Sequence, residues 1–403
     1  MMGDIPLMPV ADARARILQM ITPMVPERVP LSKALGRVLA GNVVAARTQP
    51  PADLSSMDGY AVRAADIVTV PARLKLVGES AAGKSYGAAL NPGEAVRIFT
   101  GAALPAGADA IVIQEDTERY GDYVIARENA KAGRHIRRAG LDFKEGDTGL
   151  VAGRRLSPVD IAYAAAMNVP VVIAHKRPRI GFFSTGNELV LPGAEPGPDQ
   201  IVSSNNDGLA ALIESAGGFP FDLGIVADDV VAIQSAGRHA RDCDMLVTLG
   251  GASVGDHDLV QSALSADGLT VDFWRIAMRP GKPLMFGRYR DIPMLGLPGN
   301  PVSALVCAYL FLLPAIAAMQ GLHAPVMLTR ARLGAALPAN DQREDYMRGS
   351  LVERNDMLPV ATAFERQDSS MLSAMSAADC LIVRAPSAAA AAAGDMVSVL
   401  RLR

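Results

Sequence analysis

Three short segments rich in Gly, Ser, Thr and acidic residues each follow an apolar stretch, and their composition suits anion binding. The segment DMLVTLGGASVGDHD contains Gly250, Gly251, Ser253 and Gly255. Glycines let backbone N–H groups approach an anion closely, and a following helix start adds a positive dipole end. We interpret this segment as a phosphate-binding loop in which Asp256 and Asp258 could hold Mg²⁺, since hard cations favour carboxylate oxygens. The alternative is an ordinary tight turn with two helix-capping Asp residues.

The other two segments are STGNE in IGFFSTGNEL and LPGNP in LGLPGNPVSAL. The first contains Thr185, Gly186, Asn187 and Glu188, and the second contains Pro298, Asn300 and Pro301. Glu188 could orient a ligand hydroxyl or act as an acid or base, and its simpler interpretation is a solvated loop residue. Asn300 is predicted to cap a helix that begins at Pro301, and the free N–H groups of that helix, with Ser303, could bind an anion.

Cations and further acids occur near turns. Arg275, Arg279 and Lys282 surround a Pro-Gly turn in RIAMRPGKPLMFG, where three cations could hold an oxyanion, and surface charges are the alternative. Asp58 in PPADLSSMDGYAVR and Asp142 in RRAGLDFKEGD would each be ordinary turn residues if taken alone.

The elements around these segments predict the domain that positions them. From Arg179 to about Gly321, apolar strand-like runs alternate with amphipathic helical segments, which predicts a mostly parallel, doubly wound α/β sheet. Ligands of such sheets bind beyond the carboxyl ends of the strands, where all three segments fall. We therefore expect the chemistry at that edge.

The rest of the chain predicts an α/β multidomain protein with three further domains. Residues 9–22 place apolar side chains at helical spacing, residues 46–138 consist of short β-rich runs, and Ser157 followed by Pro marks a helix start. The tail from about 325 is strand-like, and the alanine run 388–393 is expected to be a surface turn or short helix. The expected domains are 1–45 with 139–176 (N-terminal, helical and β), 46–138 (inserted β-rich), 177–325 (α/β) and 326–403 (C-terminal β).

Composition excludes several classes of function. Lys plus Arg number 39 against 42 acidic residues, so no basic field exists for nucleic acid. The N-terminal residues have no export signal, and the apolar run Ala304–Met319 is shorter than a membrane span and contains Pro314, which predicts a buried helix. Cys243, Cys307 and Cys380 are expected to be reduced core residues, and no zinc motif occurs. We expect a cytoplasmic protein without membrane or nucleic-acid partners.

Eight segments in register resemble the molybdopterin molybdenumtransferase family, which includes bacterial MoeA proteins and the carboxy-terminal part of gephyrin. They are PPADLSSMDGYAVR, IFTGAALPAGADAIVIQED, GRHIRRAGLDFKEGD, RIGFFSTGNEL, IVSSNNDGLAALI, TLGGASVGDHD, MRPGKPLMFG and LPGNPVSAL. The resemblance implies a homodimer of four-domain subunits whose third domain binds molybdopterin. It implies that adenylylated molybdopterin and molybdate react with the help of Mg²⁺ to give molybdenum cofactor and AMP.

The resemblance also implies a role for individual residues. Glu188, Asp228 and Asp258 stand at functional acidic positions of the family, and the STGNE and GGASVGDHD loops would hold the pterin and its phosphates. Asp58, Thr100 and Asp142 match positions important for activity and would approach the site from the partner subunit. The molybdate region of the family is matched by Arg279, Lys282, Pro283, Ser303, Arg348 and Ser370. Molybdate is a tetrahedral dianion, so cations and hydroxyl donors suit it.

Two other functions remain open from the sequence. One is a non-catalytic molybdopterin-binding or scaffold protein, and the other is a paralogue dedicated to tungsten or to one pathway. The acids at Asp58, Asp142, Glu188, Asp228 and Asp258 favour catalysis, because a binding protein would tolerate their loss. A molybdopterin adenylyltransferase and downstream cofactor-modifying proteins are possible partners.

Overall fold

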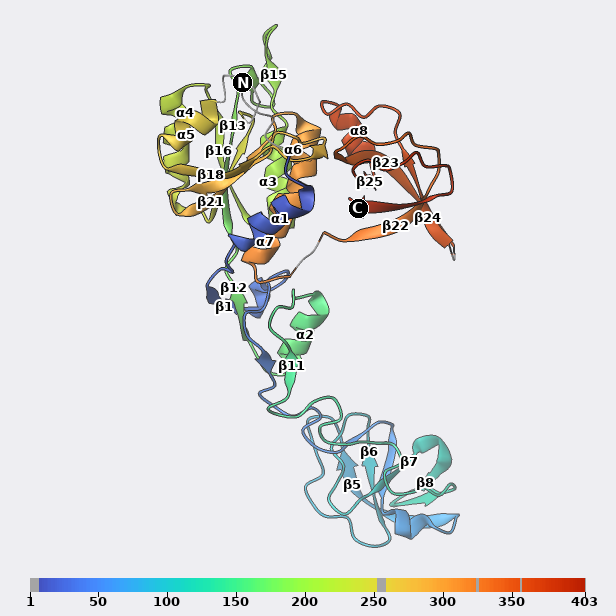
Figure 1. Cartoon of the computed structure of the whole chain (residues 1–403). Coiled ribbons are helices and arrows are strands. Elements are labelled where there is room, and N and C mark those ends of the chain that lie inside the picture. Colours follow the sequence, from blue (N-terminus) through green and yellow to red (C-terminus); the bar gives the residue numbers. More distant parts are fainter. Residues whose placement is uncertain (1–6, 252–258, 324–325, 356, 403) are drawn as a thin grey trace. The chain divides into compact units, whose positions relative to one another are not determined.

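The structure, a computed structural model, describes residues 7–251, 259–323, 326–355 and 357–402. Contacts divide the chain into two compact units, one made of Met1–Glu27 with His175–Arg403 and the other of Arg28–Ala174. The first unit holds the α/β domain and the C-terminal β domain, and the second holds the small helical and β domain and the β-rich insert (Figure 1). The α/β multidomain class is confirmed.

A six-stranded sheet forms the centre of the α/β domain. Its strand order is β16 (Phe219–Val226), β13 (Arg179–Thr185), β17 (Met245–Leu249), β21 (Ile292–Leu297), β20 (Met285–Tyr289) and β18 (Leu269–Trp274). The first four strands pair in parallel, and β20 and β18 are added antiparallel. Helices connect the parallel strands, as such crossovers require. The predicted mostly parallel sheet is therefore confirmed.

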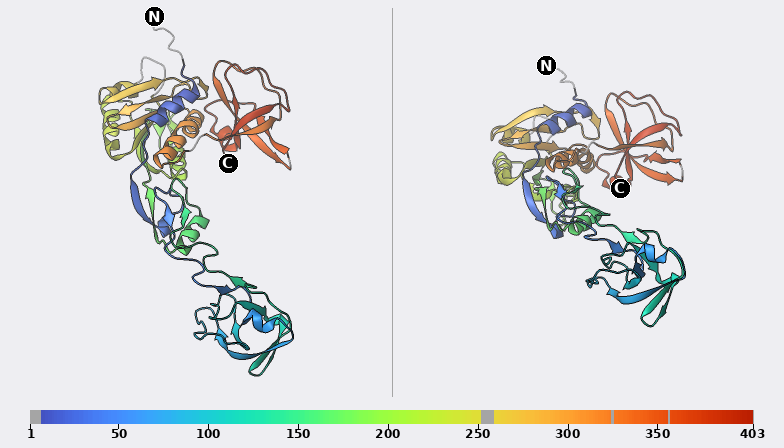
Figure 2. Two further views of the ribbon diagram at one scale, coloured as in Figure 1. Left: turned by 60° about the horizontal axis from the view of Figure 1, so that its bottom comes forward. Right: turned by 90° about the horizontal axis from the view of Figure 1, so that it is seen from below.

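The two faces of this sheet carry separate cores. Successive side chains of a strand point to opposite faces, so Phe182 and Phe183 belong to different clusters. The Phe182 face is covered by α1 (Val10–Gln19), α3 (Asn205–Ser215), α6 (Pro301–Cys307) and α7 (Leu313–Met319). The Phe183 face is covered by α4 (Val230–His239) and α5 (Leu259–Ser265). Figure 2 shows these layers from two further directions.

One helical stretch, Pro301–Met319, has the length and apolar composition of a membrane span, but 78% of its most apolar window is buried inside the protein. It consists of α6, a π-helical turn η5 (Ala308–Leu312) and α7. Pro314 has no N–H to donate to the preceding turn of the helix. The π-helical turn η5, which is wider than an α-helical turn, ends just before α7, where Pro314 lies. The prediction of a buried core helix is confirmed.

Helix α1 packs in the α/β domain, which corrects the expected grouping of residues 1–45 with 139–176. Val10, Ala13 and Ile17 form its buried face, as the helical spacing predicted. That face contacts α7 and η5 instead of the small domain. The spacing of apolar residues shows which face of a helix is covered, but it does not show which element covers it.

The small domain of the second unit is built on short strand pairs. It pairs β1 (Pro26–Pro30) with β12 (Val171–His175) and β2 (Val43–Val44) with β11 (Thr148–Leu150), beside helix α2 (Pro158–Ala166). Ser157 accepts a hydrogen bond from the Asp160 N–H, and the Asp160 carboxylate accepts one from the Ser157 N–H. This capping box confirms the predicted helix start.

The insert is a six-stranded sheet, as the β-rich texture of residues 46–138 predicted. Its order is β7 (Ala110–Ile113), β4 (Gly59–Val62), β6 (Glu94–Ile98), β5 (Ala72–Ser80), β9 (Tyr123–Ala126) and β8 (Thr117–Tyr120). A further pair joins β3 (Leu54–Ser55) to β10 (Ile136–Arg137). Buried side chains such as Val62 and Val96 fill cores on both faces of this sheet.

The C-terminal domain is a closed barrel. Its strands are β23 (Glu344–Arg354), β24 (Met357–Ala363), β22 (Leu328–Leu333), β26 (Met396–Arg401) and β25 (Cys380–Arg384), and the β23–β25 pairing closes the ring. The alanine run 388–393 lies in a turn region between β25 and β26. One strand of the α/β domain, β19 (Met278–Arg279), joins the barrel by pairing in parallel with β23. This pairing ties the two domains of the first unit together.

Candidate functional site

An open cleft of about 1400 Å³ lies at the carboxyl ends of the parallel strands. Fourteen residues predicted from the sequence line it: Thr185, Gly186, Glu188, Asp228, Gly250, Gly251, Arg279, Lys282, Pro283, Pro298, Asn300, Pro301, Ser303 and Ser370. Neighbouring strands bring them together, because Ser184 on β13 is in register with Leu249 on β17, and Leu249 with Leu297 on β21. The described starts of the three Gly-rich segments, after Thr185, Leu249 and Leu297, therefore lie side by side, as the rule for α/β sheets predicts.

Some predicted residues lie outside the described part of the chain. Ser253, Gly255, Asp256 and Asp258 belong to residues 252–258, which the structure does not describe. Among the described residues, no group of three His, Cys, Asp or Glu side chains is arranged to hold a metal ion. The assignment of Mg²⁺ to the two Asp residues therefore stays a prediction.

The turn at Gly250 and Gly251 can be formed only by small residues. Both have a left-handed backbone, with φ of +90° and +66°. A Cβ atom on Gly251 would lie 2.1 Å from Cγ2 of Val260, and one on Gly250 would lie 3.0 Å from the Thr185 carbonyl oxygen. The glycines thus allow β17 to end directly against β13 and against the start of α5, which keeps backbone groups at the cleft surface.

Two acidic residues, Glu188 and Asp228, lie in the loops that follow β13 and β16. Asp228 accepts a hydrogen bond from the Asn187 N–H, and the Asn187 side chain accepts one from the Asp228 N–H, both at 3.2 Å. Asn187 thus fixes the loop that carries Asp228, although it does not itself line the cleft. The Glu188 carboxylate folds over Gly186, where a Cβ atom would lie 2.6 Å from Oε2. Among the described residues, neither acid forms an ion pair, so both remain available to a ligand.

Asn300 occupies the predicted cap position of α6 but does not cap the helix. Its Nδ2 donates to the Ser369 hydroxyl at 2.9 Å. Pro301 has no N–H, and the next one, on Val302, donates to the Ser369 carbonyl at 3.2 Å. A residue of the C-terminal domain therefore takes the place of the cap, and LPGNP becomes a contact between the two domains. The prediction of a capping side chain is wrong.

The three predicted cations separate into two places. Arg275 has a left-handed backbone and lies over the Trp274 ring at 4.1 Å, away from the cleft. Arg279 and Lys282 line the cleft. Arg279 donates to Asp345 at 2.5 Å, and this hydrogen bond raises the pKa of the guanidinium. The expected compact cluster is corrected to Arg279 and Lys282, because aromatic stacking holds Arg275 elsewhere.

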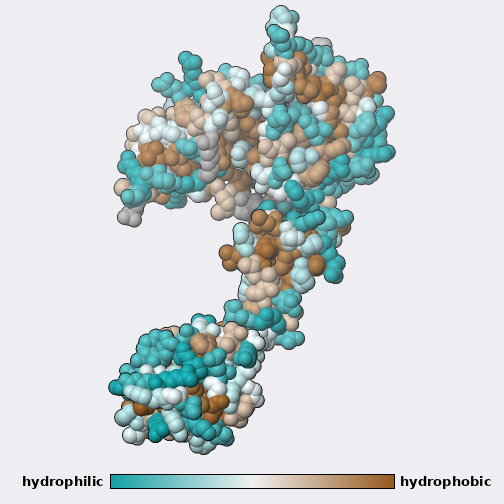
Figure 3. All heavy atoms as spheres, turned by 180° about the vertical axis from the view of Figure 1, so that it is seen from behind, coloured by the Kyte–Doolittle hydropathy of each residue, from teal (hydrophilic) through white to brown (hydrophobic). Residues whose placement is uncertain are grey.

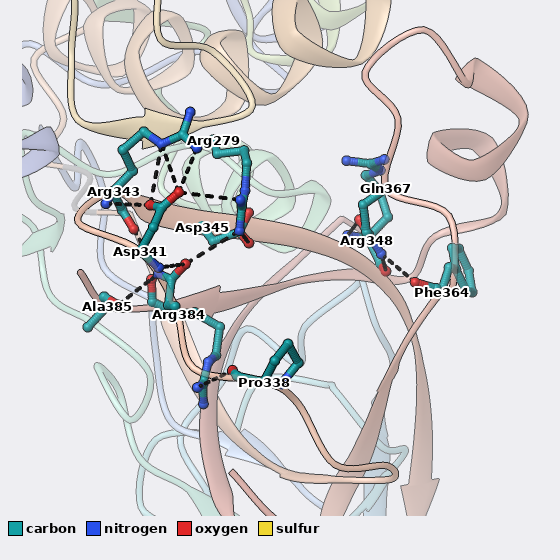
Figure 4. A network of polar contacts seen from close by, with 11 residues as sticks. Arg279, Pro338, Asp341, Arg343, Asp345, Arg348, Phe364, Gln367, Arg384 and Ala385 are labelled. Atoms are coloured by element: carbon teal, nitrogen blue, oxygen red, sulfur yellow. Dashed lines mark hydrogen bonds and ion pairs between the residues drawn. The ribbon is translucent and has the colours of Figure 1, made fainter. Parts of the chain in front are cut away.

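Arg348 does not line the cleft, contrary to the prediction that it binds molybdate. Its side chain is 1% exposed, and its Nη2 donates to the Asp368 carbonyl at 2.9 Å. Gln367 bonds to the backbone of Arg348 through both its amide atoms (Figure 4). Burial lowers the pKa of the guanidinium. Arg348 instead supports the 367–370 loop, which presents Asp368, Ser369 and Ser370 to the cleft.

Sequence reasoning missed one cation of the cleft wall, Arg343. It lies just before β23 in the segment DQREDYMRG, where an Arg between acids resembles a surface ion pair. It does form that pair, with Asp341 at 2.6 Å, and Arg343 lowers the pKa of Asp341 to about 2. The one feature of the sequence that could have indicated Arg343 as a cleft residue was its position close to Arg348, which was predicted to bind molybdate.

In the second unit, Asp58 and Thr100 are in direct contact. The Asp58 carboxylate accepts hydrogen bonds from the Thr100 N–H and hydroxyl, and these bonds lower the pKa of Asp58. Arg97 supports the same turn by donating to the Gly59 carbonyl at 3.1 Å. Asp142 lies on another turn, where its N–H donates to the Gln49 carbonyl at 3.0 Å. The structure thus brings Asp58 and Thr100 into contact, whereas Asp142 lies on a separate turn.

Comparison with known proteins covers almost the whole chain. Family models match residues 8–168 (MoeA N-terminal region, domains I and II), 181–318 (probable molybdopterin binding domain) and 330–402 (MoeA C-terminal region, domain IV). The molybdopterin molybdenumtransferase of Nostoc sp. is 38% identical over 81% of this chain and 77% of its own length. That of Haemophilus influenzae is 36% identical over 77% of each.

Solved structures agree with this match. Two structures of a molybdopterin biosynthesis MoeA protein from Pyrococcus horikoshii superpose with TM-scores of 0.86 and 0.84. They are 29% and 27% identical to this chain, cover 99% and 98% of it, and are themselves covered to 100% and 99%. The three family models and the identity over most of the chain lead to one conclusion: the chain belongs to the molybdopterin molybdenumtransferase (MoeA) family.

Proposed function

We propose that this protein inserts molybdenum from molybdate into adenylylated molybdopterin and releases AMP, as a step of molybdenum cofactor biosynthesis. The observation that carries the proposal is the cleft, in which loops suited to phosphate and a cationic wall suited to an oxyanion face one space. Relatives named for this transfer support it. A pterin nucleotide and a small dianion need these two kinds of surface within reach of each other.

Each side of the cleft has a different task in the proposed reaction. The loops at Thr185, Gly250 and Pro298 hold the pterin and its phosphates through backbone N–H groups. Lys282, Ser303 and Ser370 hold molybdate, because ammonium and hydroxyl groups donate to its oxygens. Transfer to the dithiolene needs loss of oxide from molybdate and cleavage of the phosphoanhydride, so proton donors must reach both leaving oxygens. Glu188 and Asp228 line the cleft and are suited to this task.

The acidic residues also fit the proposed requirement for Mg²⁺. Carboxylate oxygens are its usual protein ligands, and we assign Mg²⁺ to Asp256 and Asp258, which lie outside the described residues; Glu188 and Asp228 line the cleft. When bound, Mg²⁺ would neutralise phosphate charge as the anhydride breaks. The carboxylates of this chain would hold and orient it.

A homodimer is part of the proposal, because the small domain exposes apolar side chains. Leu35, Val151, Val159 and Ile173 are 64%, 58%, 75% and 39% exposed. Figure 3 shows apolar surface gathered over this domain. Exposed apolar patches of this kind mark contacts between proteins. We place the reaction in the cytoplasm, in keeping with three buried cysteines that form no disulfide.

The test combines two measurements on purified protein given adenylylated molybdopterin, Mg²⁺ and molybdate. We expect AMP release together with protein-bound molybdenum, and omission of Mg²⁺ should abolish both. Tungstate in parallel ranks the two metals and tests for a tungsten-specific paralogue. Tight pterin binding with neither AMP nor molybdenum would overturn the transferase and favour a binding or scaffold protein.

A further inference from the structure

Strand β16 contains one residue more than the strand with which it pairs. Phe182 on β13 lies opposite Asp222 on β16. Ser184, two residues further along β13, lies opposite Ile225, which is three residues further along β16. A β-bulge of this kind bends a strand and changes the direction of the side chains that follow it. Gly224, with φ of +83°, supplies a residue that adopts the left-handed conformation easily at this point.

The packing of β16 shows the same extra residue. Phe221, Leu223 and Val226 pack into the core on the Phe183 face of the sheet, at spacings of two and then three residues. A regular strand places every second residue on one face. Without the extra residue the end of β16 would shift by one position, and such a shift turns each side chain to the other face. The bulge therefore decides how the chain leaves β16 toward Asp228.

The side chain of Asn206, on α3, holds this bulge. Its Nδ2 donates to Oδ1 of Asp222 at 2.8 Å and to the Gly224 carbonyl at 3.4 Å. The same oxygen of Asp222 accepts the Gly224 N–H at 2.8 Å. On its other side, Oδ1 of Asn206 accepts a hydrogen bond from the Ser184 hydroxyl. One amide group therefore joins the bulge of β16 to the end of β13.

Asn206 supports the cleft from behind. It is 4% exposed and Ser184 is 0% exposed, so neither side chain lines the cleft. Buried polar groups are costly unless they form hydrogen bonds, and both atoms of this amide do so. The residues that do line the cleft follow directly in the chain, Thr185 after Ser184 and Asp228 after the end of β16. Asn206 thus acts on cleft residues through the backbone that carries them.

We propose that Asn206 is a positioning residue, which fixes the bulge of β16 and thereby directs Asp228 toward the loop that follows β13. Asn187, in that loop, makes two reciprocal hydrogen bonds with Asp228, so this pair forms only when both loops are in place. The inference rests on the proposed function, in which Glu188 and Asp228 serve the leaving oxygens. It deepens that function by adding a residue that acts through Asp228 without touching a ligand.

The test uses the full-length protein and removes the support of the bulge. Asp222→Ala deletes the oxygen that accepts from Asn206 and Gly224, at an exposed position where a substitution is compatible with folding. Asp222→Asn keeps an acceptor oxygen and should behave like wild type. Asn206→Asp keeps the size of the side chain but cannot donate to Asp222. Asp244→Ala is the matched control, because it removes an acceptor of the Arg179 N–H at the opposite end of β13.

Residue-resolved amide hydrogen exchange is the measurement that does not depend on activity. Exchange of the Asn187 and Asp228 N–H groups should become roughly tenfold faster in Asp222→Ala and in Asn206→Asp, the effect of losing about one hydrogen bond. Both rates should stay at the wild-type value in Asp222→Asn and Asp244→Ala. Unchanged exchange in a folded Asp222→Ala protein would overturn the inference, as would an equal increase in Asp244→Ala.

Turnover separates positioning from stability. For Asp222→Ala, kcat for AMP release should fall roughly tenfold while KM for adenylylated molybdopterin stays within about twofold, because neither Asp222 nor Asn206 lines the cleft. A lowered melting temperature with wild-type kcat and wild-type exchange would reduce the network to a stabilising role and overturn the inference. If wild type releases no AMP, the proposed function fails, whereas the exchange rates still decide the inference about Asn206.

Discussion

One oxygen of Asp58, Oδ1, accepts two hydrogen bonds from Thr100, at 2.7 Å from its N–H and at 2.8 Å from its hydroxyl. Asp58 directly precedes β4, and Thr100 lies just after β6. The antiparallel pairing of Gly59 on β4 with Ile98 on β6 brings the two residues together. The bonds fix the direction of the carboxylate and lower its pKa. Asp58 is therefore presented as an oriented anion.

Removing only the hydroxyl bond tests this arrangement. Thr100→Val keeps the backbone N–H and should reduce turnover by roughly tenfold, because a hydrogen bond to a charged group is lost. The pKa of Asp58 should rise toward its ordinary value of 3.8, which a carboxyl NMR titration records. Thr100→Ser keeps the hydroxyl and serves as the control. Turnover of Thr100→Val equal to that of Thr100→Ser would show that the contact is unimportant.

Asp58 is further expected to act on the cleft of the partner subunit. Asp58→Asn and Glu188→Gln proteins should each be inactive, whereas mixed dimers should regain activity, since one of their two sites would then carry neither substitution. AMP release from tagged, purified mixed dimers measures this. No recovery in confirmed mixed dimers would place Asp58 and Glu188 at one site within a single subunit or remove Asp58 from the site.

Lys282 is predicted to serve molybdate and not the pterin. Lys282→Ala should raise the molybdate concentration for half-maximal activity about tenfold, as expected for one charge-assisted contact. Binding of adenylylated molybdopterin should be unchanged. Lys176→Ala, which removes an exposed lysine off the cleft wall, is the matched control. Equal weakening of both ligands would mean that Lys282 lies in the pterin pocket.

Asp267 is expected to be important for the stability of the α/β domain. Its carboxylate is 8% exposed and accepts hydrogen bonds from Arg238, Arg290 and Tyr289. Asp267→Asn should lower the free energy of unfolding by about 2 kcal/mol, since two guanidinium groups and the buried Tyr289 hydroxyl lose a charged partner. Denaturant unfolding measures the change, and Asp242→Asn, at an acid 79% exposed, should leave stability unaltered.

The pH dependence of that effect follows from the direction of the pKa shift. The hydrogen bond from Arg238 is the largest cause that lowers the pKa of Asp267 far below its ordinary value. A lowered pKa stabilises the folded state above the pKa of the unfolded state, about 3.9, and this contribution is lost as pH falls through the folded value. The difference between wild type and Asp267→Asn should therefore persist from neutral pH to about pH 5 and shrink only in stronger acid.

Gly251 is predicted to be irreplaceable because of space as well as conformation. A Cβ atom there would lie 2.1 Å from Val260, so Gly251→Ala must displace the start of α5 and should weaken pterin binding more than tenfold. Gly36→Ala is a matched control, since Gly36 has φ of +73° and nothing within 4 Å of its Cβ position. Calorimetry with adenylylated molybdopterin compares the two. Equal binding by both variants would mean that the loop tolerates a side chain.

The sequence by itself determined the architecture and the edge of the sheet where the cleft lies. Strand and helix alternation from Arg179 onward predicted the parallel sheet, because each element is apolar on the faces it buries. The Gly-rich turns STGNE, GGASVG and LPGNP predicted the cleft, since such turns follow parallel strands at one edge of the sheet. These are local patterns, and local patterns can be read along a chain.

Only the tertiary structure decided which side chains face the cleft. Arg343 and Arg348 lie on the same segment, yet Arg343 lines the cleft and Arg348 is 1% exposed, because barrel closure buries Arg348 and the β19–β23 pairing brings Arg343 beside Arg279. Asn300 was predicted to cap α6 with its side chain, but in the structure the Val302 N–H donates to the Ser369 carbonyl instead. At such positions, burial and hydrogen-bond partners depend on residues that are distant in sequence. They therefore cannot be predicted from the local sequence pattern.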